Sequence, residues 1–171
     1  MSYEIHQQLN AQLPAAKVWQ VLEDYPAVVK YAPTVKDSAC VSEHKSGLGA
    51  KRKVTFHHDG SSLIEEITDY REGQGYTMQV SALSAPLVAM QADIDVYPSG
   101  ERDCQIKMHI QFEVKPGFLG RLMATLLLKP MMGKVALKLI TGLAYYAVTA
   151  QAIDKHLPAK QVLVDTIGQP S

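Results

Sequence analysis

Residues 104–114, CQIKMHIQFEV, are followed by Pro116-Gly117 and then by residues 118–156, FLGRLMATLLLKPMMGKVALKLITGLAYYAVTAQAIDKH. In the first stretch every second residue is apolar, which predicts a β-strand with one buried face. In the second stretch apolar residues recur at helical spacing, which predicts a long helix with one break or kink at Pro130. This helix is the only element of the chain long enough to cover one face of a sheet.

The sequence before residue 104 supplies the rest of that sheet. Alternating runs separated by turn residues predict about six consecutive antiparallel strands from Val35 to Val114. A first strand is predicted at Tyr3–Leu9, and two short helices follow at Ala15–Tyr25 and Ala27–Tyr31. The order predicts an α+β fold in which a curved antiparallel sheet of about seven strands surrounds a long C-terminal helix, with two short helices after the first strand.

The composition of the 171 residues is typical of one neutral globular domain. Apolar residues make up 47% and charged residues 20%, which excludes a disordered chain and a collagen-like fibre. The 17 Lys and Arg residues balance the 17 Asp and Glu residues, so we expect no nucleic-acid partner. We expect one ligand-binding domain at residues 1–158 and a loosely held C-terminal tail at residues 159–171.

Neither end of the chain nor its cysteines predict export. The N-terminal residues have no basic and apolar segments of a secretory signal, so we expect a cytoplasmic protein. Basic residues interrupt the apolar stretch 118–150, so we expect no stable insertion into a membrane. Cys40 and Cys104 match no disulfide framework and no zinc-ligand spacing, and we expect reduced thiols.

One hairpin decides which polar side chains face the interior. Asp59-Gly60 favours a two-residue type I′ turn, which pairs Phe56 with Leu63, Val54 with Glu65 and Arg52 with Ile67. This register puts Arg52 and Glu65 on the apolar face as diagonal neighbours, within reach of an ion pair. Two interpretations remain open: the two side chains reach water at the edge of the sheet, or they form a polar anchor inside an apolar pocket.

The same alternation predicts the residues that line the space between sheet and helix. We expect a ligand to contact Arg52, Val54, Phe56, Glu65, Ile67, Tyr76, Met78, Met90, Ile94, Met108, Ile110, Phe112, Leu139 and Leu143. On the helix the predicted apolar stripe is Leu122, Leu126, Val135, Leu139, Ile140, Leu143 and Ala147. Other polar groups able to reach the interior are Gln7, His58, Tyr25, Tyr31 and Tyr146.

The chain contains none of the common catalytic motifs. Nucleotide-binding glycine motifs, the zinc-protease motif and the serine-hydrolase elbow are all missing. His57 and His58 are consecutive in a strand and point to opposite faces, and His6 and His109 are predicted to face solvent, so we expect no metal site and no cofactor. The catalytic residues, if any, are unknown, and Glu65 is the one candidate for a general base.

Several segments resemble the START-like SRPBCC superfamily. They are VWQVLEDY at residues 18–25, KYAP at residues 30–33, EEITDY at residues 65–70, and the segment from Leu119 to Pro130. The sequence looks most similar to the polyketide cyclase/dehydrase and lipid-transport branch, and the likeness covers residues 3–156. It implies a helix-grip fold with a hydrophobic cavity that opens near the two short helices and the strand-end loops. Members of the superfamily bind lipids, sterols, quinones, polyketides or plant hormones, and some catalyse cyclisation or dehydration.

Three functions follow as hypotheses. The favoured one is non-enzymatic binding or transport of a small hydrophobic molecule, such as a lipid, quinone or polyketide, oriented by Arg52 or Glu65. The second is an enzyme of the cyclase or dehydratase type with Glu65 as the base. The third is an interaction partner that uses an exposed apolar surface at Leu126–Met132. The sequence does not predict an oligomeric state.

Overall fold

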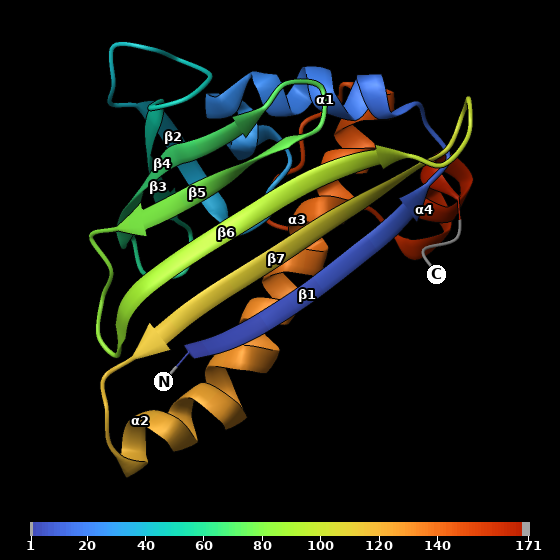
Figure 1. Ribbon diagram of the computed structural model, residues 1–171. Helices are drawn as coiled ribbons and strands as arrows, with labels where there is room; N and C mark the ends of the chain where they lie inside the picture. Colours follow the sequence, from blue (N-terminus) through green and yellow to red (C-terminus); the bar gives the residue numbers. More distant parts are fainter. Residues whose placement is uncertain (1, 169–171) are drawn as a thin grey trace.

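The chain folds into one antiparallel sheet with all its helices on one side. A computed structural model describes residues 2–168, and in it the strand order β1-β7-β6-β5-β4-β3-β2 forms a seven-stranded sheet (Figure 1). The strands are β1 (Ser2–Ala11), β2 (Val35–Cys40), β3 (Lys51–Phe56), β4 (Ser62–Arg71), β5 (Gly75–Ser81), β6 (Leu87–Pro98) and β7 (Cys104–Val114). The predicted α+β arrangement with six consecutive strands after the short helices is confirmed.

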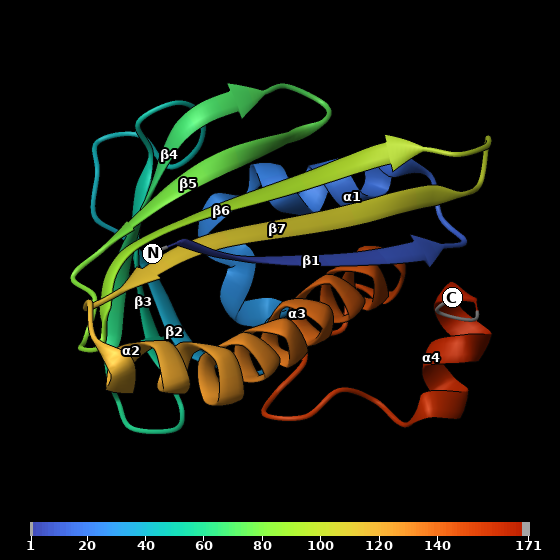
Figure 2. The same ribbon diagram turned by 60° about the horizontal axis from the view of Figure 1, so that its bottom comes forward.

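The helices cover the inner face of the curved sheet and leave the outer face free (Figure 2). They are α1 (Ala15–Glu23), the 3₁₀ helix η1 (Tyr25–Lys30), α2 (Phe118–Met123), the π-helical η2 (Ala124–Leu128), α3 (Lys129–Thr149) and α4 (Lys160–Ile167). The long helix α3 packs against β1 and β7, which are the first and last strands of the chain and neighbours in the sheet. No helix among residues 2–168 has the length and apolar character needed to cross a membrane.

The long helical segment differs from the prediction in two places, at its internal break and at its C-terminal end. The irregularity lies before Pro130, in the π-helical turn η2, and Pro130 itself occupies the first turn of α3, where its missing N–H is tolerated. The helix ends at Thr149 and not at His156, because Ala150 adopts a left-handed conformation (φ 54°). The chain then bonds to η1, where the Lys30 carbonyl oxygen accepts a hydrogen bond from the Ile153 N–H at 2.8 Å.

Part of the predicted apolar stripe is wrong. Leu122 and Leu126 are exposed, whereas Ile140 and Leu143 are fully buried. The physical reason is position, since α2 extends beyond the end of β7 and no strand is left there to cover it (Figure 1).

The C-terminal segment is more ordered than we expected. Helix α4 buries Leu163 and Ile167, and the Ile167 carbonyl oxygen accepts a hydrogen bond from the Gln12 N–H at 2.9 Å. This contact ties the segment to the end of β1, so the expectation of a loosely held tail is wrong for residues 160–167. Residues 169–171 of that tail lie outside the described residues.

The hairpin between β3 and β4 has a different register from the predicted one. Arg52 lies directly opposite Glu65 and not opposite Ile67, and every predicted pair is displaced by two residues. The carboxylate of Asp59 accepts a hydrogen bond from the Ser61 N–H at 2.9 Å, which shapes a longer turn than the two-residue type I′ turn. Because side chains alternate with a period of two, the displacement leaves each of them on its expected face.

Close contact between α3 and η1 predicts a strong effect of one methyl group. A Cβ atom at Gly142 would clash with the Tyr31 carbonyl oxygen, whereas one at Gly133 in the same helix would meet the flexible Gln7 side chain at 3.3 Å. We predict that Gly142→Ala lowers the free energy of unfolding by about 1–3 kcal/mol. Gly133→Ala should change it by less than about 1 kcal/mol, because helix propensity offsets the contact. Urea denaturation measures both, and equal losses would contradict this packing.

Candidate functional site

An ion pair between neighbouring strands lies on the inner face of the sheet. The Nε of Arg52 on β3 donates to the Oε2 of Glu65 on β4 at 2.6 Å. The Arg52 side chain is 3% exposed and the Glu65 side chain 17%. The interpretation in which both side chains reach water is therefore wrong, because the guanidinium lies in the interior.

Three further contacts hold the guanidinium. One terminal nitrogen donates to the Tyr25 carbonyl oxygen at 2.5 Å, and the other lies 3.6 Å from the Met78 sulfur. The carbon of the guanidinium lies 3.9 Å from the centre of the Tyr25 ring, a cation–π contact. Arg52 thus joins η1 to β3, β4 and β5. Burial acts to lower the pKa of Arg52, but the charge of Glu65 outweighs this effect and keeps the guanidinium charged.

Three buried tyrosines surround Arg52. The rings of Tyr25 and Tyr76 meet edge to face at 5.4 Å, and the side chain of Tyr31 interacts with Arg52 and Tyr76. Burial raises the pKa of all three phenols, although the Arg52 charge acts in the opposite direction. The tyrosines are therefore neutral hydrogen-bond donors at physiological pH.

One of these donors is unused. Among the described residues, the buried hydroxyl of Tyr25 has no hydrogen-bond partner. A buried polar atom without a partner is destabilising, and native proteins rarely contain one unless a water or ligand satisfies it. The sequence places Tyr25 and Tyr31 among the polar groups able to reach the interior, but not among the predicted ligand contacts. Strand alternation predicts those contacts, whereas the orientation of the two tyrosines depends on the position of η1.

The predicted ligand-contacting residues come together in one apolar core. Most are buried and pack in the same cluster: Val54, Ile67, Tyr76, Met78, Ile94, Met108, Ile110, Phe112 and Leu143. Three are half-buried at its margin: Phe56, Met90 and Leu139. Of the other polar groups, His58 is exposed in the β3–β4 turn, and Tyr146 faces Lys30 beside α1.

Two hollows lie outside this apolar core. One, with a volume of about 370 Å³, lies on the outer face of β1 and β7 beside His6 and His109. The other, also about 370 Å³, lies between α1 and the end of α3, beside Val21 and Tyr146.

The fold agrees with a comparison against known families. The family of polyketide cyclases/dehydrases and lipid-transport proteins matches residues 4–145, which is most of the chain. The chain belongs to this family. The predicted membership of the START-like SRPBCC superfamily and the helix-grip fold are both confirmed. No curated protein matches the sequence.

Solved structures share the fold at low sequence identity. Truncated norcoclaurine synthase from Thalictrum flavum is 17% identical with a TM-score of 0.66, over 87% of this chain and 95% of that one. The Zhui aromatase/cyclase from a Streptomyces species is 10% identical with a TM-score of 0.65, over 90% and 100%. Ara h 8.0201 is 15% identical with a TM-score of 0.66, over 87% and 99%. At these identities the likeness shows the fold alone.

The Arg52–Glu65 pair predicts a specific pattern of stability. We predict that Arg52→Met lowers the free energy of unfolding by about 3–5 kcal/mol, because it leaves the Glu65 carboxylate in the interior without its partner. The double variant Arg52→Met with Glu65→Leu should recover most of that loss. Urea denaturation of the two single variants and the double variant measures the coupling. Additive losses would show that the two side chains do not act as a pair.

Proposed function

We propose that this member of the polyketide cyclase/dehydrase and lipid-transport family binds a small hydrophobic molecule that carries an oxygen acceptor, such as a quinone, a polyketide or an acyl lipid. The supporting observation is the unused Tyr25 hydroxyl beside the buried Arg52–Glu65 pair, in an interior that is otherwise apolar. Burial of apolar surface supplies affinity, and a few fixed polar groups supply orientation.

The charge balance of the cluster favours a neutral acceptor over a second charge. The carboxylate of Glu65 already compensates the guanidinium of Arg52 at 2.6 Å. A ketone or quinone oxygen can accept from the Tyr25 hydroxyl without disturbing that pair. A carboxylate would have to compete with Glu65 for Arg52.

Access to the cluster runs past adaptable side chains. Met90 on β6 and Met132 and Leu139 on α3 are half-buried and pack against the margin of the core. The unbranched side chains of Met90 and Met132 change rotamer easily, so a ligand can displace them at low energetic cost. The π-helical turn η2 lies next to this margin, and such turns are weaker points in a helix.

The enzyme hypothesis has less support. A general base needs a carboxylate oxygen free to accept a proton from the substrate. The Glu65 Oε2 is bound to Arg52, which leaves Oε1 as the oxygen that could accept a proton, and the neighbouring tyrosines are neutral donors rather than bases. The arrangement suits holding and orienting a carbonyl compound more than removing its protons.

Native mass spectrometry tests the proposal on the purified chain, first for a bound molecule and then with decylubiquinone and oleate as probes. Decylubiquinone should bind more tightly than oleate, because it offers neutral carbonyl oxygens. Tyr25→Phe should weaken quinone binding about 5–10-fold, the effect of one hydrogen bond. It should not destabilise the free protein, because the lost hydroxyl has no partner there.

A second pair of variants locates the binding site. Met90→Trp should fill the margin of the core and reduce probe binding, whereas Val88→Trp, at an exposed position of the same strand, should not. If neither probe nor any copurified molecule binds, or if binding is equal in Tyr25→Phe, Met90→Trp and the unchanged chain, the proposal is wrong.

A second candidate function rests on an exposed apolar surface at α2 and η2. Phe118 is 78% exposed and Leu126 is 68% exposed. With their neighbours they form what we call the α2–η2 surface: Phe118, Leu119, Leu122, Met123, Leu126, Leu127 and Met131. Folded monomers rarely leave so many large apolar side chains together in water.

The charges beside this surface favour an anionic lipid bilayer as the occupant. Between Glu113 and Asp154 the chain contains five basic residues and no acidic one. Arg121 and Lys129 are exposed beside the apolar side chains. A basic helix with an exposed apolar face lies in the surface of an anionic bilayer, where a carrier could also take up a hydrophobic molecule. We propose that the α2–η2 surface docks there.

Vesicle sedimentation tests this docking. The chain should bind vesicles that contain phosphatidylglycerol and not vesicles of phosphatidylcholine alone. Leu126→Glu with Leu127→Glu should weaken binding at least about tenfold, since the two leucines lose their burial in the bilayer. Val162→Glu, at an exposed position of α4, is the matched control. Unchanged binding in the leucine variant, or no binding to either vesicle, would refute lipid docking.

A further inference from the structure

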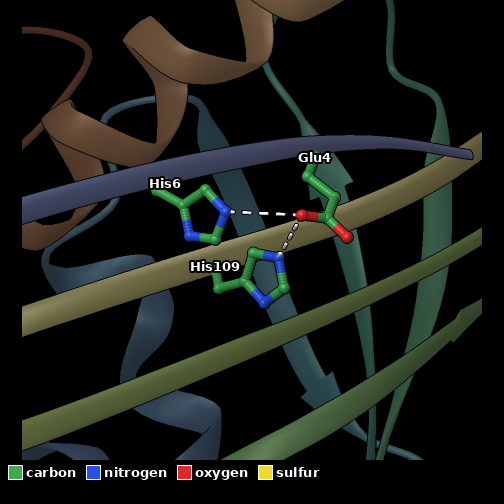
Figure 3. A group of neighbouring side chains, drawn as sticks. All are labelled: Glu4, His6 and His109. Atoms are coloured by element: carbon green, nitrogen blue, oxygen red, sulfur yellow. Dashed lines mark ion pairs between the residues drawn. The ribbon is translucent and has the colours of Figure 1, made fainter.

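Two histidines and a glutamate meet on the outer face of the sheet, away from the apolar core. Glu4 and His6 are alternate residues of β1, so both side chains point to the same face. His109 on β7 is the direct cross-strand partner of His6. Figure 3 shows the three side chains side by side, two from β1 and one from β7. The side chains of Glu4 and His6 on β1 therefore lie next to the side chain of His109 on β7.

The donor atoms are close enough to share an ion. The Glu4 Oε2 lies 3.5 Å from the His6 Nε2 and 3.8 Å from the His109 Nε2, and all three atoms lie within 4.8 Å of one another. Ligand atoms around a tetrahedral Zn²⁺ with bonds of about 2.0–2.1 Å are roughly 3.3 Å apart. The imidazole rings are stacked at 4.2 Å, and the His6 side chain is 68% exposed, so it can turn to complete the geometry.

His109 has the hydrogen bond that a metal-binding histidine needs. Its Nδ1 lies 3.2 Å from the Asp93 Oδ2, and the other oxygen of Asp93 accepts from the Thr77 hydroxyl at 2.6 Å. A histidine that donates Nδ1–H to a carboxylate presents the lone pair of Nε2. Among the described residues, that Nε2 is buried and has no hydrogen-bond partner.

There is also room for an additional ligand. The outer hollow of about 370 Å³ is bordered by His6 and His109 and, farther along, by Asp95 and Lys107. Lys107 points toward the ring of Tyr97, at 5.3 Å, and Asp95 is paired with Arg71. Three protein ligands with an open fourth position are typical of zinc sites that keep a water or a small ligand.

We propose that Glu4, His6 and His109 bind a divalent transition-metal ion of the zinc class on the outer face of the sheet. Two imidazoles and one carboxylate are ligands that Zn²⁺ prefers, and Asp93 positions His109 for it. This site differs from the one we expected to be absent at His57 and His58, which cannot converge on one ion. It is separated from Arg52 by the sheet and does not depend on the proposed hydrophobic ligand.

Titration of the purified, metal-free chain with Co²⁺ and Zn²⁺ tests the site. Co²⁺ should give the visible absorption bands of a four-coordinate ion, and Zn²⁺ should displace it. Asp93→Asn should weaken Zn²⁺ binding about 10–100-fold, and His109→Ala or His6→Ala should weaken it more. Glu4→Gln keeps the size of an exposed side chain and should also weaken binding without affecting folding.

His57→Ala is the matched control, because it removes a histidine outside the cluster and should leave both titrations unchanged. Circular dichroism checks that each variant is folded. Equal Zn²⁺ affinity in the unchanged chain, Glu4→Gln and His109→Ala would overturn the proposal, as would the absence of four-coordinate Co²⁺ bands in the unchanged chain.

Discussion

The burial of the Arg52 guanidinium constrains the whole inner face of the sheet. A charged group removed from water is tolerated only if its hydrogen bonds and charge are matched. Glu65 supplies the charge, the Tyr25 carbonyl oxygen a hydrogen bond, and the Tyr25 ring a cation–π contact. Since Tyr25 begins η1, the guanidinium fixes the 3₁₀ helix against the strands. The position of η1 therefore depends on one side chain of β3.

The pleat of the sheet separates two chemical environments that share the same strands. Met108 points inward to the core, and His109, the next residue of β7, points outward to the metal-ligand cluster. Behind that cluster a polar network continues across the outer face through Thr77, Asp93 and Arg71. A ligand on one face and an ion on the other can consequently be bound by the same strands without contact between them.

The long C-terminal helix also has two roles along its length. Over β1 and β7 its residues Ile140 and Leu143 complete the core, and Gly142 allows η1 to approach closely. Beyond the sheet, α2 and η2 keep the same apolar composition but leave most of their large apolar side chains exposed. The margin of the core at Met132 lies between these two parts.

Sequence alone determined the type and order of the elements from β1 to α3 and the face on which the strand residues lie. Those properties follow from local periodicity, and even the displaced β3–β4 register preserved them because it moved by two residues. Tertiary structure decided which side chains meet. The Asp59 hydrogen bond in the turn set Arg52 against Glu65, and the pairing of the first strand with the last set His6 beside His109. It also decided that Leu126 faces outward, because exposure depends on where the sheet ends. Such contacts join residues far apart in the chain, and no periodicity of a single segment encodes them.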